Sequence, residues 1–238
     1  LDIAGNRGQV SSTNWQYDTS IATPTLTLNQ GALFANAATV SVSVSNDTEA
    51  SGWMIGTMTG KPDKDDSRWL TDSPTGFGLG TLEGTRTVYL WTKDAVGNIS
   101  ATATASIFCD RTIATPTLSL GGTFTTSLLV TIQIGTDTDV VSWLLSEGQP
   151  TPPLSNDSRW SASKPSVFSL SSGSGVKNVY LWVRDIAGNM SYCRESIAID
   201  ADPPIIILSQ PASGGFGTQN IQVKYSLSED IATATLSF

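Results

Sequence analysis

Residues 88–100 read VYLWTKDAVGNIS, and residues 179–191 read VYLWVRDIAGNMS. A stretch this similar that returns after about 90 residues is an internal repeat, which decides the architecture before any single residue is considered. Three further segments return in the same way: DSRW at 66–69 and 157–160, IATPTLTL at 21–28 and IATPTLSL at 113–120, and DIAGN at both 2–6 and 185–189.

The repeat predicts four segments of chain. Residues 1–17 correspond to the last strand of a preceding repeat, and 18–109 and 110–199 are complete repeats. Residues 200–238 open a further repeat of a different subtype, because they lack the tryptophan found at 53 and 143. A unit of about 90 residues suits a small domain rather than a solenoid repeat, so we expect beads on a string.

Within each repeat the hydrophobic period is two. Val40, Val42 and Val44 alternate with serines, which is typical of a strand with one buried face, and no segment has helical spacing. The same reasoning predicts strands at 24–28, 39–45, 51–57, 77–82, 87–93 and 99–108, and at 115–120, 127–134, 140–146, 166–171, 178–184 and 190–199. Several short strands per repeat with turns rich in Gly, Pro, Asp and Asn indicate an all-β Greek-key sandwich.

Composition excludes several classes of function. The chain has no His, which removes Ser-His-Asp catalysis and His-based zinc sites. Its net charge of −8 argues against nucleic acid as a partner. The longest wholly apolar candidate, 205–208, is far shorter than the roughly 20 residues that span a bilayer, so this segment inserts in no membrane. The acidic residues recur at loop ends in each repeat, as a structural feature would, and we expect no enzyme.

The pattern VYLW-x-x-D-x-x-GN, followed by a strand, an Asp and a Thr-Pro or Pro-Pro opening, resembles the bacterial Ig-like domains found in tandem in large secreted or cell-surface proteins. That resemblance implies tandem Ig-like β-sandwiches and a bacterial extracellular or cell-surface location. It also implies a role as spacer or stalk, and some members of the family bind calcium at domain junctions.

In an Ig-like sandwich, the loop after the second strand and the last hairpin turn lie at the pole beside the incoming linker. This placement gathers oxygen ligands that suit calcium, and predicts a site between domains. The candidates are Asp18, Asp47, Glu49, Asp94 and Asn98 in the first repeat and Asp110, Asp137, Asp139, Asp185 and Asn189 in the second. The alternative is that these residues are ordinary turn formers that bond their own backbone.

Cys109 and Cys193 occupy different places on the last strands of their repeats, so they are no pair within one domain. They leave two alternatives: a disulfide between domains in an oxidising compartment, or two free thiols that behave as small hydrophobic side chains.

The tryptophans raise a second function, stacking on sugars. Trp53 and Trp143 fall on the third strand, where we expect core packing. Tyr89 and Trp91, with their counterparts Tyr180 and Trp182, share one face of the sixth strand. We expect the segment that carries Arg68-Trp69 or Arg159-Trp160 to cover this face, with arginine stacked on indole. If instead the rings are exposed, they contact glycans or a neighbouring protein.

The sequence therefore predicts a non-enzymatic stalk, adhesin or filament segment whose partners are neighbouring copies or other surface proteins. Two alternatives stay open: a glycan-binding module of a polysaccharide-active secreted protein, and a fibre, sheath or surface layer that assembles by strand complementation.

Overall fold

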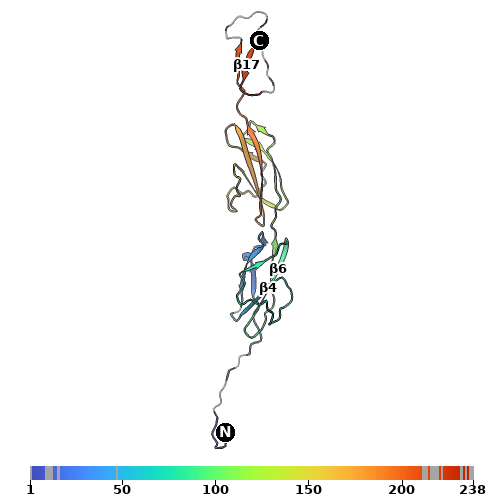
Figure 1. Ribbon diagram of the computed structural model, residues 1–238, viewed down its shortest axis with the longest axis vertical. Helices are drawn as coiled ribbons and strands as arrows, with labels where there is room; N and C mark the ends of the chain where they lie inside the picture. Colours follow the sequence, from blue (N-terminus) through green and yellow to red (C-terminus); the bar gives the residue numbers. More distant parts are fainter. Residues whose placement is uncertain are drawn as a thin grey trace. The chain divides into compact units, whose positions relative to one another are not determined.

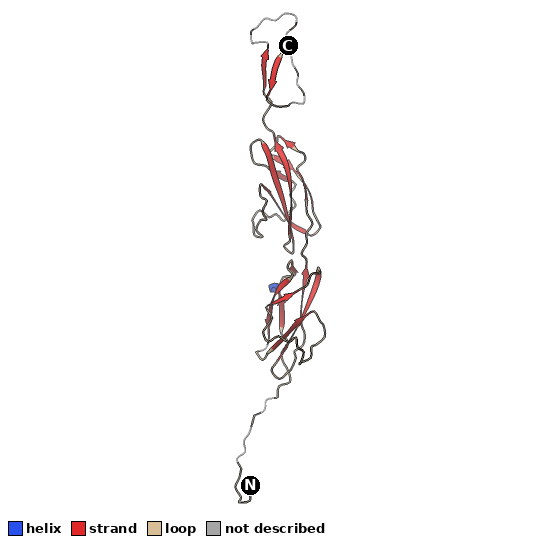
Figure 2. Cartoon of the chain, in the orientation of Figure 1, coloured by secondary structure: helices blue, strands red, loops and turns tan. Residues whose placement is uncertain are grey.

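A computed structural model describes residues 2–8, 13, 14, 17–46, 48–210, 214, 220, 222–230, 233 and 235. Over these residues the chain is all-β, and the one helical segment is the short 3-10 turn η1 (Asn29–Gly31) (Figure 2). The chain divides into two compact units, 1–113 with Asp185–Asn189, and 114–184 with 190–238. No described helix is long and apolar enough to cross a membrane.

The first sandwich has a three-stranded sheet in the order β1-β3-β5 and a four-stranded sheet in the order β2-β7-β6-β4. Figure 1 shows β4 and β6 side by side in the second of these sheets. The bounds are β1 (Thr25–Leu28), β2 (Phe34–Ala35), β3 (Thr39–Ser45), β4 (Gly52–Gly56), β5 (Gly76–Gly78), β6 (Gly84–Lys93) and β7 (Ala103–Cys109).

The core of this sandwich follows from strand alternation. On β3, Val40 and Val42 are buried while the intervening serines are exposed. The two valines pack with side chains from both sheets, and the buried cluster comprises Leu28, Ala35, Val40, Val42, Leu79, Val88, Ile107 and Cys109. Burial of these apolar side chains from two facing sheets is the main stabilisation of such a sandwich.

The first strand changes sheets, because β1 belongs to the first sheet and β2 to the second. The chain turns at Asn29, Gln30 and Gly31, whose φ angles are 43°, 56° and 89°. Beyond this turn β2 pairs with β7 in parallel, whereas the other pairings in the sandwich are antiparallel. A first strand shared between sheets and a last strand that returns beside it are features of the Ig-like sandwich.

The second sandwich repeats this order. Its four-stranded sheet runs β12-β14-β15-β9, and the facing layer consists of the pairs β8-β11 and β10-β13. The bounds are β8 (Thr117–Ser119), β9 (Phe124–Thr125), β10 (Leu129–Thr131), β11 (Gln133–Gly135), β12 (Val140–Glu147), β13 (Val167–Ser169), β14 (Gly175–Asp185) and β15 (Met190–Ile199). The fold is thus tandem Ig-like β-sandwiches, as the sequence predicts.

Two further segments differ from a complete sandwich. Between residues 2 and 17 the described residues form no strand, although the sequence predicts one there; a strand needs a partner for its backbone groups, and the described residues offer none to this segment. Towards the other end, β16 (Ile206–Gln210) pairs only with β17 (Lys224–Leu227). The domain bounds 1–17, 18–109, 110–199 and 200–238 stay a prediction.

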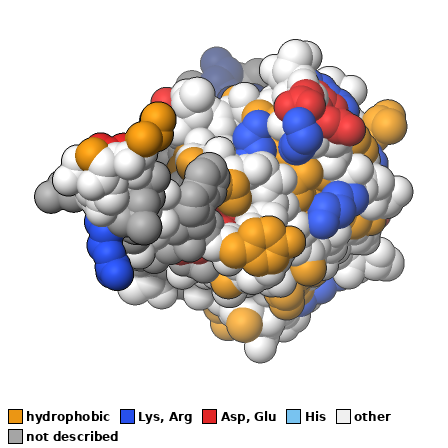
Figure 3. Space-filling model, turned by 90° about the horizontal axis from the view of Figure 1, so that it is seen from below, with side chains coloured by type: hydrophobic (Ala, Val, Ile, Leu, Met, Phe, Trp, Pro, Cys, Tyr) orange, Lys and Arg blue, Asp and Glu red, His pale blue; other side chains and the backbone are white. Residues whose placement is uncertain are grey.

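The surface carries few charges. In the face shown in Figure 3, basic and acidic side chains are scattered among uncharged and hydrophobic groups and touch at the upper right, in keeping with the charged fraction of 14%. Such a face offers no continuous basic area for a nucleic acid.

Candidate functional site

The recurring Asp-x-x-Gly-Asn segment is a hairpin turn closed by its own carboxylate. In the first repeat, Oδ1 of Asp94 accepts hydrogen bonds from the backbone N–H groups of Val96, Gly97 and Asn98 at 3.0, 2.7 and 2.8 Å. Oδ2 accepts the side-chain amide of Asn98 at 2.7 Å. Gly97 has φ +97°, a conformation that side chains with a Cβ disfavour, which explains the glycine.

The other two copies form the same turn. Oδ1 of Asp185 accepts the backbone N–H groups of Gly188 and Asn189, and Oδ2 accepts the Asn189 side-chain amide at 2.8 Å. Oδ1 of Asp2 accepts the N–H groups of Ala4 and Asn6, and Oδ2 accepts the Asn6 side-chain amide at 2.8 Å. In all three copies the carboxylate accepts the backbone N–H and the side-chain amide of the last Asn, which indicates that the motif serves local structure in each.

The hydrogen bonds also hold the carboxylates of Asp94 and Asp2 in their charged form. Burial alone would raise the pKa of Asp94, but the Asn98 amide and the backbone N–H groups of the turn outweigh it and lower the pKa below 3.8. The Asn6 side chain lowers the pKa of Asp2 in the same direction. Donors aimed at a carboxylate favour its ionised form.

The turn of residues 185–189 belongs to the same compact unit as Asp110. Asn189 donates from Nδ2 to the backbone carbonyl of Asp110 at 3.0 Å and to Oδ1 of Asp110 at 3.5 Å. The structure thus brings Asp110, Asp185 and Asn189 together, as the sequence predicts, but Asn189 faces Asp110 as a hydrogen-bond donor and not as an oxygen ligand.

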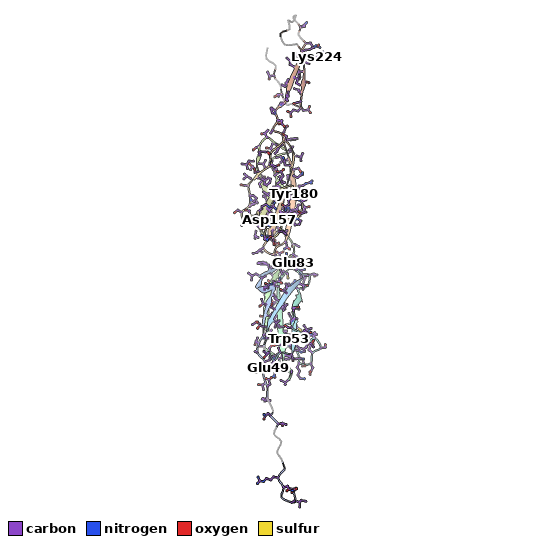
Figure 4. All side chains as sticks on the ribbon, turned by 90° about the vertical axis from the view of Figure 1, so that its left-hand side faces the viewer. Glu49, Trp53, Glu83, Asp157, Tyr180 and Lys224 are labelled. Atoms are coloured by element: carbon purple, nitrogen blue, oxygen red, sulfur yellow. The ribbon has the colours of Figure 1, made fainter. Side chains whose placement is uncertain are left out.

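The remaining calcium candidates differ in their exposure. Asp18 and Glu49 are exposed, and Asp18 accepts the N–H of Ser20 at 3.2 Å. Figure 4 shows Glu49 and Trp53 towards one end of the first sandwich and Glu83 towards the other. Asp137 is exposed and Asp139 half-buried just before β12. Asp47 lies outside the described residues.

Calcium takes six to eight oxygen ligands, and the turns satisfy that requirement only in part. Oδ1 of Asp94 already accepts three hydrogen bonds, so the turn is stable without an ion. Asp139 differs, because its Oδ1 is buried and has no hydrogen-bond partner among the described residues. A buried carboxylate oxygen of this kind is a group that a cation would satisfy, and calcium binding stays a prediction.

The aromatic face of the sixth strand is buried. On β6, Val88 faces the core cluster while Trp91 lies on the opposite side, and yet Trp91 is 0% exposed. Its counterpart Trp182 on β14 is 3% exposed, and Tyr89 and Tyr180 are half-buried. The alternative, in which exposed rings of Trp91 and Trp182 contact glycans or a neighbouring protein, is not realised in this structure, because both indoles are buried.

The cover on this face is the long segment that follows the strand β4 or β12. We call residues 57–75 strap 1 and residues 148–166 strap 2. Strap 1 forms an antiparallel bridge to β4 between Leu70 and Trp53, and strap 2 forms one to β12 between Ser161 and Trp143. The sequence predicts such a cover, and the structure confirms it.

A cation from the central strand stacks on a tryptophan of each strap. Nζ of Lys93 lies 4.9 Å from the ring centroid of Trp69, and Cζ of Arg184 lies 4.8 Å from that of Trp160. These are cation–π distances. The stacked arginine is thus Arg184 on β14, on the same face as Trp182.

The arginines within the straps have another role. Arg68 forms a bidentate pair with Asp66, at 3.0 Å from Nε and 2.6 Å from Nη2, and Arg159 pairs with Asp157 at 3.0 and 2.7 Å. The arginine side chain in each pair lowers the pKa of the aspartate to about 2. The DSRW motif therefore stabilises a local turn through the bonds between its own Asp and Arg.

Trp53 and Trp143 are only half-buried. Trp53 shares the core-facing side of β4 with Ile55, which packs against the core cluster, and its Nε1 donates to Oδ1 of Asn46 at 3.2 Å. The expectation of full core burial fits Trp91 and Trp182 instead, because the straps add a third layer over the sheet.

Both cysteines are free thiols. Cys109 is 0% exposed and belongs to the core cluster of the first sandwich, so its sulfur is enclosed by its own domain. Cys193 is half-buried, and burial, with a contribution from the charge of Glu195, raises its pKa to about 11. The alternative of a disulfide is not realised in this structure.

One polar cluster in the second repeat could not be found by comparing the two repeats. Ser171 donates from N and Oγ to Glu147 at 2.8 and 2.7 Å, and Nζ of Lys177 donates to Oγ of Ser171 at 2.9 Å. The backbone N–H of Ser171, foremost among its partners, lowers the pKa of Glu147. The residues at the corresponding places in the first repeat differ, so repetition could not find this cluster.

No protein-family model matches the chain, and no curated protein matches it either. Among solved structures it is similar to fibronectin(III)-like modules of Clostridium thermocellum CbhA, with 12% identity, 73% of this chain and 92% of that chain covered, and a TM-score of 0.46. It is also similar to the FN1-FN3 domains of chicken CNTN1, with 10% identity, coverage of 76% and 68%, and a TM-score of 0.41. A tetra-tandem repeat in the extending region of a large adhesion protein matches with 17% identity, coverage of 79% and 51%, and a TM-score of 0.29. These neighbours are fibronectin(III)-like modules and tandem repeats of an adhesion-type protein.

Proposed function

We propose that the chain is a non-enzymatic structural segment of a long extracellular or cell-surface protein of the stalk, adhesin or filament type. The contacts that recur in both repeats support this structural role. The carboxylates of Asp94 and Asp185 bind their own turns, Asp66 and Asp157 bind neighbouring arginines, and the central tryptophans are covered. The repeated polar groups serve the fold of each sandwich.

The pairing of the first and last strands carries the proposal. In the first sandwich, the N–H groups of Phe108 and Asp110 donate to the carbonyls of Leu33 and Ala35, both at 2.9 Å, where β2 runs parallel to β7. In the second, Ala198 and Asp200 donate to Thr123 and Thr125 at 2.9 and 3.0 Å. Because parallel strands are pulled in opposite directions at their far ends, tension along the chain loads these bonds together in shear.

Single-molecule force spectroscopy on the full chain, held at both ends, tests this role. We expect two unfolding events with contour gains of roughly 25–30 nm, since an extended chain spans about 3.5 Å per residue. Ala198→Pro removes one of the sheared bonds in the second sandwich, and we expect it to lower the unfolding force of one event.

A matched control separates mechanical from thermal stability. Leu144 is 1% exposed in β12, away from the sheared strands, and Leu144→Ala should destabilise the same sandwich thermally by about 3 kcal/mol. At equal loss of thermal stability, Ala198→Pro should lower the force more than Leu144→Ala does. Equal force losses, or no resolved unfolding peak in the wild-type chain, would contradict a tension-bearing role.

A second candidate function is self-assembly by strand addition. The β16-β17 pair is the observation that favours it, because each strand has only one neighbour among the described residues and Ile206, Leu208 and Tyr225 are more than half exposed. Edge strands with apolar side chains recruit further strands. Sedimentation velocity over a range of concentrations should then show oligomers that Leu208→Lys abolishes; a concentration-independent monomer would rule this candidate out.

A further inference from the structure

We propose that each strap is a cover that opens without unfolding of the sandwich beneath it, and that strap 1 opens more readily than strap 2. Opening strap 1 exposes the aromatic pair Tyr89 and Trp91, which lie stacked with ring centroids 6.2 Å apart. The chain would then carry a concealed apolar surface in addition to its structural role.

The first step of the argument is how few residues of each strap are themselves buried. In strap 1 only Pro62 and Pro74 are buried, and in strap 2 only Pro153. The strap salt bridges are exposed, with side-chain exposures of 58% for Arg68 and 49% for Arg159. Segments with few buried apolar contacts and exposed hydrogen bonds open at a lower free energy than the core strands they cover.

The second step compares the attachments of the two straps. Each has one backbone bridge to the sheet: Leu70 donates to the Trp53 carbonyl at 2.8 Å, and Ser161 donates to the Trp143 carbonyl at 2.9 Å. Each also receives a cation from the central strand. Nζ of Lys93 donates to the carbonyl of Lys64 at 2.7 Å, and Nη1 of Arg184 donates to that of Ser155 at 2.7 Å. Strap 1 has a further tie in the exposed hydrogen bond from Nζ of Lys61 to the carbonyl of Ile99, and strap 2 has a further tie from the N–H of Gly148 to the carbonyl of Asn178 at 3.0 Å.

The third step is the difference between the two buried indoles. Nε1 of Trp182 donates to the carbonyl of Gln149 in strap 2 at 3.2 Å. Nε1 of Trp91 is buried and has no hydrogen-bond partner among the described residues. Closing strap 2 therefore forms a bond, whereas closing strap 1 buries an unpaired donor, which is costly. Opening hydrates the Trp91 N–H and relieves that cost.

Amide hydrogen exchange measured by NMR tests the proposal, because Leu70 and Ser161 are matched reporters. After correction for intrinsic rates, we expect the Leu70 amide to exchange roughly tenfold faster than that of Ser161. Both should exchange much faster than the amides of Leu90 and Leu181, in the middle of β6 and β14, which report global unfolding. Exchange of Leu70 and Ser161 at the rates of those strand amides would overturn the proposal.

Two equivalent substitutions isolate the indole N–H. Trp91→Phe and Trp182→Phe remove the same volume, but only the second breaks a hydrogen bond and leaves the Gln149 carbonyl without its donor. We expect Trp182→Phe to accelerate exchange of the Ser161 amide by a larger factor than Trp91→Phe accelerates exchange of the Leu70 amide. The difference in exchange rate between these two amides should therefore be smaller in the variants than in the wild-type chain. Equal factors would show that the unpaired donor plays no part.

A surface substitution keeps the test informative if either core variant fails to fold. Lys93→Gln removes the cation over Trp69 while leaving the buried layer intact. We expect faster exchange at Leu70 and no change at Leu90. A parallel change at both amides would mean that the strap and the sheet unfold together.

Discussion

The side-chain amide of Asn98 donates a 2.7 Å hydrogen bond to Oδ2 of Asp94, while Oδ1 of the same carboxylate accepts three backbone N–H groups. Asp94 is 4% exposed, so its charge is compensated within one turn. A buried carboxylate is tolerated when it is fully hydrogen-bonded, and removing it leaves several donors unpaired.

Asp94→Ala should therefore destabilise the first sandwich by about 3 kcal/mol, because the N–H groups of the turn lose a charged acceptor. Asn98→Ala removes one donor and should cost about 1 kcal/mol. Urea unfolding followed by circular dichroism measures both. Asp72→Ala, at an exposed position, is the control and should change stability by no more than about 0.5 kcal/mol. A loss as small as the control's for Asp94→Ala would contradict the role assigned to the turn.

The lowered pKa of Asp94 predicts a pH dependence. Its folded pKa lies below 3.8, so its contribution to stability is present above the unfolded pKa of about 4 and is lost as the pH falls through the folded value. Asp66 and Asp157, with pKa values of about 2, act in the same direction, but their arginine partners are exposed and such pairs contribute little. Thermal midpoints should be nearly constant from about pH 7 to about pH 4 and fall below it.

Comparing the wild-type chain with Asp94→Asn checks whether Asp94 causes the loss of stability at low pH. Its difference in midpoint from the wild-type chain should shrink at low pH, where the wild-type carboxylate is itself protonated. A difference that stays constant from neutral pH to pH 2 would show that another group governs the acid sensitivity.

The sequence predicted the strands well where the apolar side chains alternate on one face. The run of Val and Ser from Thr39 to Ser45 forms β3 with the expected bounds. The sequence missed β2 and β9, because two-residue strands have no measurable period and arise where the first strand changes sheets. The hairpin turns were also predicted correctly, since Gly97 and Gly188 both adopt positive φ in them.

The burial of the tryptophans could not be predicted from alternation. A period of two places Val88 and Trp91 on opposite faces of the strand, but it does not say whether another segment covers the face that carries Trp91. Strap 1 does so, and Trp91 becomes fully buried while Trp53, near the end of the core, stays half-buried. Alternation places Lys93 and Arg184 on the same face as Trp91 and Trp182, but it does not say that they stack on Trp69 and Trp160, which lie far from them in sequence.

Calcium should raise the thermal midpoint if it binds at Asp139. The reason is that Oδ1 of Asp139 is buried without a hydrogen-bond partner among the described residues, and an ion bound only to the folded state stabilises it by mass action. Differential scanning fluorimetry with millimolar calcium or with chelator measures the shift. Asp139→Asn should abolish it, whereas Asp137→Asn, at an exposed neighbouring position, should leave it unchanged. An identical midpoint with calcium and with chelator would exclude a calcium site that stabilises the fold.

The two thiols should be slow to react in the folded chain and independent of redox conditions. Cys109 is enclosed in the core, and the pKa of Cys193 is raised to about 11, so the reactive thiolate is scarce at pH 8. Labelling with a chromogenic disulfide should modify Cys193 before Cys109, both far more slowly than in urea. Because both cysteines are free thiols, reducing agent should leave the thermal midpoint unchanged. A lower midpoint on reduction, or an intact mass short of two hydrogens, would show that Cys109 and Cys193 are joined, which requires the first sandwich to release Cys109 from its core.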